Sequence, residues 1–388
     1  MNSFSQSRSV VILGATGSVG VATSQRDHER LLAQCRVHQP QYAFLSDERA
    51  ASILRDKVRD LGLATEVLTG DAQLLALVSD PEVAIVMSAI VGCAGLKPTL
   101  AAAQAGKRLL LANKESLVVA GELLIRVAAE SGAVILPIDS EHNAIYQAAP
   151  AGLPCGAEAG DFLKRSGVRR LFLMASGGPF RTAPAAELER VTPQQALRHP
   201  VWRMGPKISI DCATMMNKGL ELIEACWLFD VAPDDVKIVV HPEAVIHGMV
   251  EYVDGSVIAH MASADMRIPI AYGLHWPNRV ASGVEPLDIF TLDGLSFAES
   301  DAQKFPCLRL ARQAMVAGGI APATLNAANE EAVAAFLAEQ IAFTAIPTLV
   351  EAALDCADWR EASSVEAVLA ADAAARRVVQ DRIAAYAV

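Results

Sequence analysis

The chain has 388 residues, of which 52% are hydrophobic, enough apolar material for two or three folded domains. It carries 33 Lys and Arg against 44 Asp and Glu, so the formal net charge is −11. This charge argues against a basic nucleic-acid surface and against binding to anionic membranes. There is no Cys-x-x-Cys pair among the seven cysteines, and no apolar run is long enough to cross a bilayer. We therefore expect a cytoplasmic protein with reduced thiols.

The first predicted element is the short apolar run of residues 9–13, which is typical of a buried parallel strand. It leads directly into Gly14-Ala-Thr-Gly17-Ser-Val-Gly20. Glycines at this spacing allow a tight turn and let backbone N–H groups approach a phosphate at the start of a helix. An ordinary glycine turn is the alternative, but the position after a strand favours dinucleotide binding.

Strands and helices then alternate with short loops, which predicts a doubly wound parallel sheet of the Rossmann type. We expect strands at residues 42–45, 66–68, 83–88, 108–112 and 134–138. We expect helices at residues 27–37, 50–61, 72–78, 97–105 and 115–131.

Polar clusters follow two of these strands, at the sheet edge where ligands bind in such folds. Asn113-Lys114-Glu115 follows one strand, and Asp139-Ser140-Glu141-His142-Asn143 follows another. Asp139 and Glu141 are two residues apart, so their carboxylates point to the same side of an extended backbone. With a third carboxylate from Glu221 they would form a hard-oxygen site for Mg²⁺ or Mn²⁺. The alternative is that Asp139 or Ser140 merely caps the next helix.

The middle of the chain predicts a mainly antiparallel sheet, with strands at residues 168–175, 236–240, 245–252 and 256–261 and a hairpin turn at Asp254-Gly255. A small-residue turn beginning at Ser176 would suit a phosphate. Trp202 lies in the loop 199–206, either as part of a lid that excludes water or as a packed surface residue. His241, His247 and His260 lack metal-like spacing, so we interpret them as structural.

A helix is expected over residues 211–225, where Asn217, Lys218 and Glu221 share one face. An amide, an ammonium and a carboxylate on one rigid turn suit a substrate that carries a phosphate and a metal. For an isolated Asn-Lys-x-x-Glu, a solvated helix face is the alternative. Further helices at residues 305–317, 322–339, 346–355 and 363–386 predict a C-terminal helical bundle. The fold class is therefore α/β, followed by an α+β domain and this bundle.

Seven motifs in this order resemble the 1-deoxy-D-xylulose 5-phosphate reductoisomerase family of the non-mevalonate isoprenoid pathway. The resemblance extends from Ser9 to the final helix. The motifs are Gly14-Ala-Thr-Gly-Ser-Val-Gly20, Leu111-Ala-Asn-Lys-Glu-Ser-Leu117, Asp139-Ser-Glu-His-Asn-Ala-Ile145, Ser176-Gly-Gly-Pro-Phe180, His199-Pro-x-Trp202, Ala213-Thr-Met-Met-Asn-Lys-Gly-Leu-Glu221 and Leu325-Asn-Ala-Ala-Asn-Glu330.

The resemblance implies an NADPH-dependent conversion of 1-deoxy-D-xylulose 5-phosphate, a small phosphosugar, to 2-C-methyl-D-erythritol 4-phosphate with Mg²⁺, Mn²⁺ or Co²⁺. It also implies a homodimer whose subunit has three domains. We expect an NADPH-binding domain at residues 1–139, a catalytic and dimerisation domain at 140–276 with a flap at 199–206, a linker at 277–304 and a helical domain at 305–388.

Transferred position by position, the resemblance assigns roles to individual residues. The metal ligands would be Asp139, Glu141 and Glu221. The predicted catalytic residues are Glu141 and Lys114, with the metal-polarised hydroxyl of the substrate as an alternative to Glu141 for proton transfer. Substrate contacts are expected at Lys114, Ser140, Glu141, Ser176, His199, Trp202, Cys212, Asn217, Lys218 and Glu221. NADPH contacts are expected at Thr16, Gly17, Ser18, Val19, Arg26, Asp27, Asn113, Glu115 and Gly205.

Two features depart from the family pattern. Cys212 stands where the family usually has a serine that contacts phosphate, and a thiol is a weaker hydrogen-bond donor. The chain also lacks a helix and a strand between Thr23 and Gln25, so that no strand is expected before Gln25-Arg26-Asp27. Arg26 and Asp27 are interpreted as the remainder of the loop that reads the 2′-phosphate.

Two other functions stay open at this point. One is a catalytically impaired relative that binds metal and phosphosugar without turnover. The shortened cofactor domain favours this alternative. The other is a different dehydrogenase on the same scaffold, acting for example on a homoserine-like substrate. The three carboxylates and Asn217-Lys218 favour the phosphosugar.

Overall fold

The computed structural model describes residues 9–13, 23–24, 27–202, 204–357 and 360–386. The chain forms two compact units. Unit 1 comprises Met1–Ser116, Leu124–Ile138 and Ile270–Val280, and unit 2 comprises Leu117–Leu123, Asp139–Pro269 and Ala281–Val388. The predicted fold class, a Rossmann-like parallel sheet with an α+β part and C-terminal helices, is confirmed.

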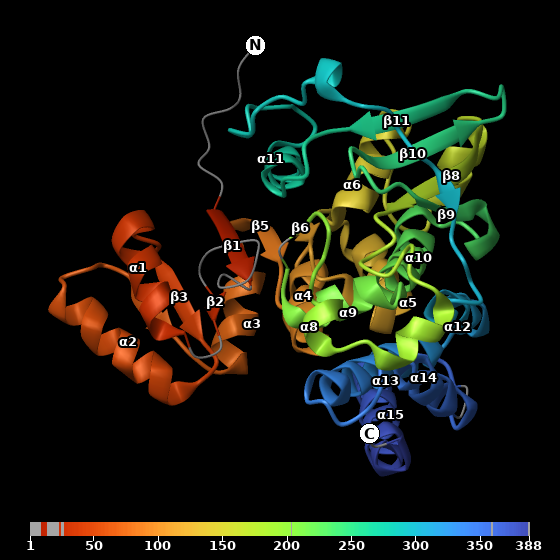
Figure 1. Cartoon of the computed structure of the whole chain (residues 1–388). Helices are drawn as coiled ribbons and strands as arrows, with labels where there is room; N and C mark the ends of the chain where they lie inside the picture. Colours follow the sequence, from red (N-terminus) through yellow and green to blue (C-terminus); the bar gives the residue numbers. More distant parts are fainter. Residues whose placement is uncertain (1–8, 14–22, 25–26, 203, 358–359, 387–388) are drawn as a thin grey trace. The chain divides into compact units, whose positions relative to one another are not determined.

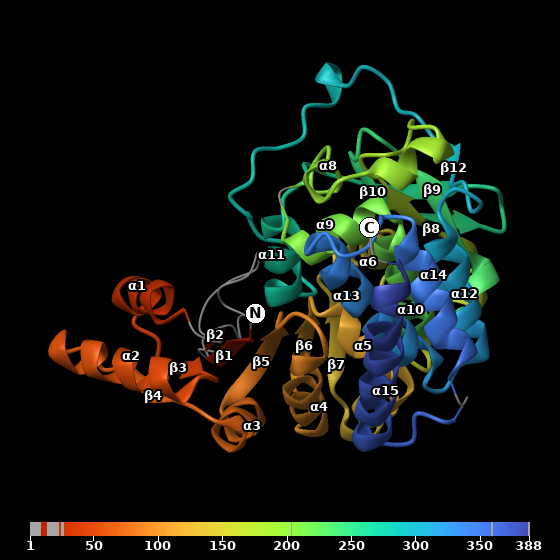
Figure 2. The same cartoon turned by 60° about the horizontal axis from the view of Figure 1, so that its bottom comes forward.

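Unit 1 contains a four-stranded sheet in the order β1-β5-β6-β7, in which every neighbouring pair is parallel. Its strands are β1 (Ser9–Leu13), β5 (Val83–Ser88), β6 (Arg108–Leu111) and β7 (Val134–Pro137). The helices that alternate with them are α3 (Asp71–Ser79), α4 (Leu96–Gln104) and α5 (Lys114–Ser131). The apolar run Leu109–Leu111 is fully buried in β6, as expected of a parallel strand that is covered on both faces (Figure 2).

A second parallel sheet in unit 1 has the order β2-β3-β4. It consists of β2 (Thr23–Ser24), β3 (Tyr42–Leu45) and β4 (Glu66–Leu68), with α1 (His28–His38) and α2 (Glu48–Asp60). The expectation that no strand precedes residue 25 is therefore wrong, because Thr23 and Ser24 pair with Phe44 and Leu45. Two residues are too few to show a periodic pattern in the sequence. Among the described residues no ladder joins β1 to β2, so the parallel strands form two sheets.

Unit 2 is built on a five-stranded sheet in the order β11-β10-β8-β9-β12. Its strands are β8 (Val168–Ala175), β9 (Val236–Val240), β10 (Ile246–Tyr252), β11 (Val257–Met261) and β12 (Ala298–Glu299). The pair β8–β9 is parallel and the other pairs are antiparallel. The predicted hairpin is confirmed, because Asp254 accepts a hydrogen bond from the Ser256 backbone at 2.9 Å in the turn between β10 and β11.

Two helices pack against this sheet and carry the acidic residues of interest. The first is α6 (Ser140–Ala148), which lies against β10 and β11, and the second is α10 (Met216–Phe229), which lies against β8 and β9 (Figure 1). The remaining helices before the C-terminal group are α7 (Ala159–Arg165), α8 (Pro193–Ala196), α9 (Pro206–Ala213) and α11 (Arg267–His275). Short 3-10 turns are η1 (Cys93–Gly95), η2 (Ala185–Arg190), η3 (Pro233–Asp235), η4 (Ile289–Thr291) and η5 (Ala384–Tyr386).

The predicted C-terminal helices are present as α12 (Pro306–Ala317), α13 (Ala321–Leu337), α14 (Ala345–Asp355) and α15 (Val365–Ile383), and α15 runs beside α13 (Figure 2). They share one hydrophobic core with the rest of unit 2, in which Ile210 and Leu220 are clustered with Leu325 and Val350. The boundary between a catalytic and a helical domain therefore stays a prediction. No described helix is both long enough and apolar enough to span a membrane.

α10 and α12 approach each other closely at Gly219. A Cβ atom at Gly219 would lie 2.6 Å from the Cβ of Ala311 and 3.4 Å from the carbonyl oxygen of Cys307. We expect Gly219→Ala to lower the free energy of unfolding by about 1–3 kcal/mol, because the added methyl group forces the two helices apart. Urea denaturation measures this change.

The matched control is Ala311→Gly, which removes the atom that the new methyl group would meet. Alone it should cost about 1 kcal/mol, the helix propensity of glycine. Combined with Gly219→Ala it should restore stability, with a favourable coupling of about 1 kcal/mol or more in a double-mutant cycle. Purely additive effects would show that the helices do not collide at this point.

Candidate active site

Three carboxylates from two helices converge on one point in unit 2. Asp139 is the N-cap of α6, Glu141 lies in its first turn, and Glu221 lies in α10. One carboxylate oxygen from each lies within 4.8 Å of the others. The structure therefore brings together the three residues that the sequence predicts as metal ligands. Their assignment as ligands stays a prediction.

Neighbouring donors hold these carboxylates in place. The Ser140 backbone N–H donates to Asp139 Oδ1 at 3.0 Å, and the Ser140 hydroxyl donates to Glu141 Oε2 at 2.5 Å. Asn217 Nδ2 donates to Glu221 Oε1 at 2.6 Å. The Lys218 ammonium donates to both Glu141 and Glu221 and so bridges the two helices.

The charges in this cluster depend on one another. Burial lowers the pKa of Lys218, but the negative charges of Glu141, Glu221 and Asp139 outweigh this effect and raise it above its ordinary value. Burial raises the pKa of Glu141, but the positive charge of Lys218 prevails and the pKa lies below its ordinary value. Lys218 is therefore protonated and Glu141 ionised at neutral pH.

The donor set fits a hard divalent cation. It consists of carboxylate oxygens, the ligands that Mg²⁺ and Mn²⁺ prefer. The side chains of Asp139 and Glu141 are each 17% exposed, whereas that of Glu221 is 1% exposed. An ion held here would be anchored in the interior by Glu221 and accessible from the side of Asp139 and Glu141.

A turn and a loop near this cluster carry the predicted phosphate contacts. Ser176 follows β8, and its hydroxyl lies 3.1 Å from His199 Nε2. His199 Nδ1 accepts hydrogen bonds from the backbone N–H groups of Val201 at 3.2 Å and of Trp202 at 2.9 Å. Burial and the positive charge of Lys218 lower the pKa of His199, against the opposing effect of Glu141. A neutral His199 ring therefore connects Ser176 with the backbone of Val201 and Trp202.

The same turn packs against the end of α9. A Cβ atom at Gly178, where φ is +68°, would lie only 2.6 Å from the carbonyl oxygen of Cys212. This close approach requires glycine and places the Ser176 turn against Cys212. The two segments that the sequence assigns to phosphate binding are therefore neighbours in unit 2.

A cavity opens beside α6. Its lining consists of Ser140, Asn143, Trp202, His247, His260, Ala262, Ser263, Asp265, Ile268 and Pro269. His247 and His260 both line this cavity, and His247 Nε2 lies 3.1 Å from the carbonyl oxygen of Ala262, so their interpretation as structural residues stays a prediction. They lie on the paired strands β10 and β11 with ring centroids 6.1 Å apart. The hairpin turn at Asp254-Gly255 is evident in the sequence. From it, the proximity of His247 and His260 could have been predicted.

His241 differs from the other two histidines. Its Nε2 accepts from the backbone N–H groups of Val245 at 3.3 Å and Ile246 at 3.2 Å, and Nδ1 lies 2.9 Å from the carbonyl oxygen of Ser296. The ring is fully buried. His241 therefore has the structural role that was expected of it.

The predicted cofactor contacts are only partly described. Thr16, Gly17, Ser18, Val19 and Arg26 lie outside the described residues. In unit 1, Asp27 caps α1 by accepting from Arg30 N at 3.0 Å, and Asn113 caps α5 by accepting from Ser116 N at 2.7 Å. Lys114 and Glu115 are buried in the first turn of α5, and in unit 2 Gly205 is the exposed N-cap of α9. Their contacts with NADPH or substrate stay predictions.

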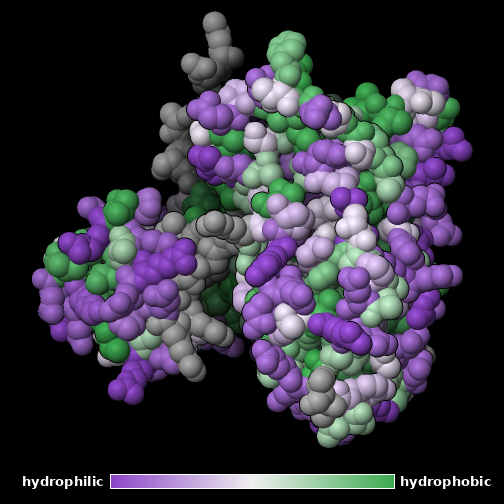
Figure 3. Space-filling view, viewed as in Figure 1, coloured by the Kyte–Doolittle hydropathy of each residue, from purple (hydrophilic) through white to green (hydrophobic). Residues whose placement is uncertain are grey.

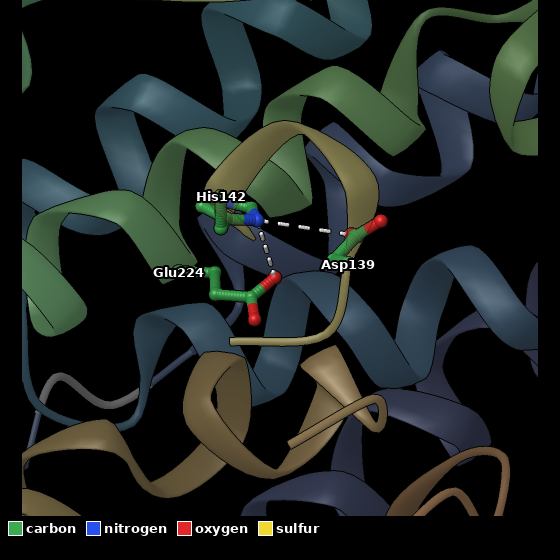
Figure 4. Close-up of side chains that lie close together, drawn as sticks. All are labelled: Asp139, His142 and Glu224. Carbon is green, nitrogen blue, oxygen red and sulfur yellow. Dashed lines mark ion pairs between the residues drawn. The ribbon is translucent and has the colours of Figure 1, made fainter. Parts of the chain in front are cut away.

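From the sequence, no role is assigned to two buried residues beside the carboxylates. His142 and Glu224 form a second cluster with Asp139, in which one nitrogen or oxygen atom from each residue lies within 4.8 Å of the others (Figure 4). His142 is part of the motif that begins at Asp139, and Glu224 lies one turn after Glu221. Helical spacing from the predicted ligands is the signal that could have identified them.

Comparison with known proteins places the whole chain in one family. A family model described as 1-deoxy-D-xylulose 5-phosphate reductoisomerase matches residues 21–121. The model of its C-terminal domain matches residues 135–229, and a model described as the DXP reductoisomerase C-terminal domain matches residues 261–378.

Full-length relatives give the same result. The 1-deoxy-D-xylulose 5-phosphate reductoisomerase of Cellvibrio japonicus is 51% identical over 395 residues, covering 97% of this chain and 99% of the relative. That of Pseudomonas fluorescens is 52% identical over 388 residues, covering 96% of each.

Solved structures agree with these relatives. A crystal structure of DOX-P reductoisomerase in complex with NADPH, fosmidomycin and magnesium has a TM-score of 0.90 and 44% identity, covering 96% of this chain and 98% of that one. The 1-deoxy-D-xylulose 5-phosphate reductoisomerase from Zymomonas mobilis in complex with NADPH has a TM-score of 0.88 and 42% identity, covering 98% and 99%. The chain belongs to the 1-deoxy-D-xylulose 5-phosphate reductoisomerase family.

Proposed function

We propose that this chain catalyses the NADPH- and divalent-metal-dependent isomerisation and reduction of 1-deoxy-D-xylulose 5-phosphate to 2-C-methyl-D-erythritol 4-phosphate, a step of non-mevalonate isoprenoid synthesis. The convergence of Asp139, Glu141 and Glu221 beside Lys218 carries this proposal. Relatives that match along almost the whole chain are named for this enzyme, and a structural neighbour holds NADPH and magnesium. Nothing in these comparisons favours an impaired relative or a different dehydrogenase.

Asp139, Glu141 and Glu221 would hold Mg²⁺ or Mn²⁺, with Co²⁺ as a further option. When bound, the ion would polarise the ketone and the adjacent hydroxyl of the substrate and stabilise the charge that develops on oxygen. Lys218 keeps Glu141 ionised, so Glu141 is the proposed proton acceptor and donor near the reacting carbons. Lys114 is the second proposed catalytic residue.

The phosphate end of the substrate would bind at the neighbouring turn and flap. The Ser176 hydroxyl and the His199 imidazole lie there, and Cys212, Asn217 and Lys218 complete the proposed set. Remote phosphate binding would orient the reacting end without taking part in the chemistry. Trp202 lines the cavity beside Ser140, which supports its assignment as the flap aromatic that excludes water.

NADPH would supply the hydride that reduces the rearranged aldehyde. We propose that it binds at the glycine-rich turn Gly14-Ala-Thr-Gly-Ser-Val-Gly20, with Asn113 and Glu115 near the nicotinamide and Gly205 closing from the flap. We also propose that the enzyme works in the reducing cytoplasm, because none of its seven cysteines forms a disulfide.

We further propose that the chain is a homodimer that associates through β11. In the described part of the chain β11 pairs only with β10, so one of its edges can accept another strand. Its residues Val257, Ile258 and Met261 are 47%, 48% and 38% exposed. Hydrophobic surface is visible around these strands at the top of Figure 3. An apolar edge strand of this kind is typical of a subunit interface.

Substituting Ile258→Lys should dissociate the dimer, because it places a charge on the proposed interface. Light scattering coupled to size-exclusion chromatography gives the mass of the particle directly. Val316→Lys is the matched control, since Val316 is 73% exposed on α12 and should leave the mass unchanged. A wild-type particle with the mass of one chain would contradict the proposal.

Removing the charge of Glu221 tests the metal site. Glu221→Gln keeps the size of the side chain but loses a buried anionic ligand, so we expect kcat/KM to fall by about 100-fold or more. The assay follows NADPH absorbance with substrate, after chelation and after re-addition of Mg²⁺ or Mn²⁺. Glu351→Gln, which alters an exposed ion pair with Arg309, should behave like the wild type. Activity that persists after chelation would exclude metal dependence.

Cys212→Ser tests the phosphate end of the site. A hydroxyl is a better donor than a thiol, so the variant should bind substrate more tightly by about 1 kcal/mol, which lowers KM about five-fold. Steady-state kinetics at saturating NADPH and Mg²⁺ measure the effect. Cys356→Ser, at an exposed cysteine, is the control. An unchanged or higher KM would contradict a phosphate contact at Cys212.

A further inference from the structure

His142 connects residues that belong to the proposed metal site. Its Nε2 lies 2.8 Å from the backbone carbonyl oxygen of Glu221. Its Nδ1 lies 3.3 Å from Oε2 of Glu224 and 3.8 Å from Oδ2 of Asp139 (Figure 4). The side chains of His142 and Glu224 are both 0% exposed. One imidazole ring thus faces two predicted metal ligands and one fully buried carboxylate.

The hydrogen-bond chemistry of the ring fixes its orientation. A backbone carbonyl only accepts hydrogen bonds, so Nε2 carries a hydrogen and donates it to Glu221. Nδ1 faces the carboxyl group of Glu224 at ion-pair distance. The ring also stacks on the buried Phe229, with centroids 6.4 Å apart and an interplanar angle of 28°. His142 is therefore held on three sides in a single rotamer.

The pair lies one helical turn from the proposed ligands on each side. His142 is three residues after Asp139 in α6, and Glu224 is three residues after Glu221 in α10. The contact between them joins these two helices at the turns that carry the carboxylates. Any shift of one helix along the other would break this contact and change the distances between Asp139 and Glu221.

We propose that His142 and Glu224 are positioning residues that set the metal affinity of the Asp139, Glu141 and Glu221 site. The inference rests on the proposed function, because it takes these three carboxylates as the ligands. His142 orients the Glu221 backbone through Nε2 and confines the Asp139 carboxylate through Nδ1. Glu224 fixes the ring. Outer partners of this kind typically contribute 10–100-fold to metal affinity.

The test measures Mn²⁺ binding by electron paramagnetic resonance of the unbound ion, without substrate or NADPH. Glu224→Gln keeps the shape of the side chain and removes its charge, and we expect its Kd for Mn²⁺ to rise about 10–100-fold. In steady-state assays the metal concentration for half-maximal rate should rise in parallel. At saturating Mn²⁺, kcat should return to within a few-fold of the wild type.

Two substitutions of His142 separate the functions of its ring nitrogens. His142→Gln places an amide donor near the position of Nε2, and His142→Asn places one near that of Nδ1. Each should weaken Mn²⁺ binding, because each keeps only one of the two contacts. Asp372→Asn is the control for the general loss of a buried carboxylate, here one paired with Arg376 in α15. It should lower the unfolding temperature and leave the Kd for Mn²⁺ unchanged.

Distinct results separate failure of the inference from failure of the proposed function. Wild-type Mn²⁺ affinity in Glu224→Gln, together with weak binding in Glu221→Gln, would overturn the positioning role alone. Wild-type affinity in Glu221→Gln would overturn the metal site itself. Two Mn²⁺ ions per wild-type chain, reduced to one in Glu224→Gln, would show that Asp139, His142 and Glu224 bind an ion of their own, which also overturns the positioning role.

Discussion

The bridge that Lys218 forms between Glu141 and Glu221 is the contact on which the arrangement of this site depends. Carboxylates that face one point repel each other, and burial strengthens the repulsion. The ammonium offsets it, because it contacts both groups and keeps Glu141 ionised. The cluster contains three carboxyl groups and a single ammonium group. A divalent ion at the proposed site would offset negative charge there, and a structure related to this chain at 43% identity is a complex with magnesium.

The scaffold allows this cluster to form because it fixes two helices against one sheet. α6 and α10 each pack on the strands of unit 2, and Gly219 lets α10 lie close to α12. α10, which carries Glu221, therefore shares a hydrophobic core with the C-terminal helices. Those helices, although remote from the chemistry in sequence, support the backbone that holds Glu221. His199 connects Ser176, a proposed phosphate contact, with the backbone of the loop that carries Trp202.

Most elements could be predicted from the sequence because their signals are local. β8 occupies the predicted residues, and Asp254-Gly255 specifies the hairpin between β10 and β11. The prediction that Asp139, Glu141 and Glu221 lie close together depended on their spacing in the sequence and on the family resemblance. Other features had no local signal. β2 is too short for periodicity, and the environment of His247 and His260 depends on how a sheet edge meets α6. In the sequence, Glu224 cannot be distinguished from an exposed glutamate on a helix, because its burial depends on tertiary packing.

The separation of the parallel strands of unit 1 into two sheets has a consequence for cooperativity. Within the described residues, the hydrogen-bonded ladder that includes β1 ends at that strand, and β2, β3 and β4 form their own ladder with a separate apolar core around Leu31 and Leu54. Backbone amides in β3 and in β6 therefore belong to different hydrogen-bonded networks. Because these two ladders are separate, amide exchange in β3 need not follow amide exchange in β6.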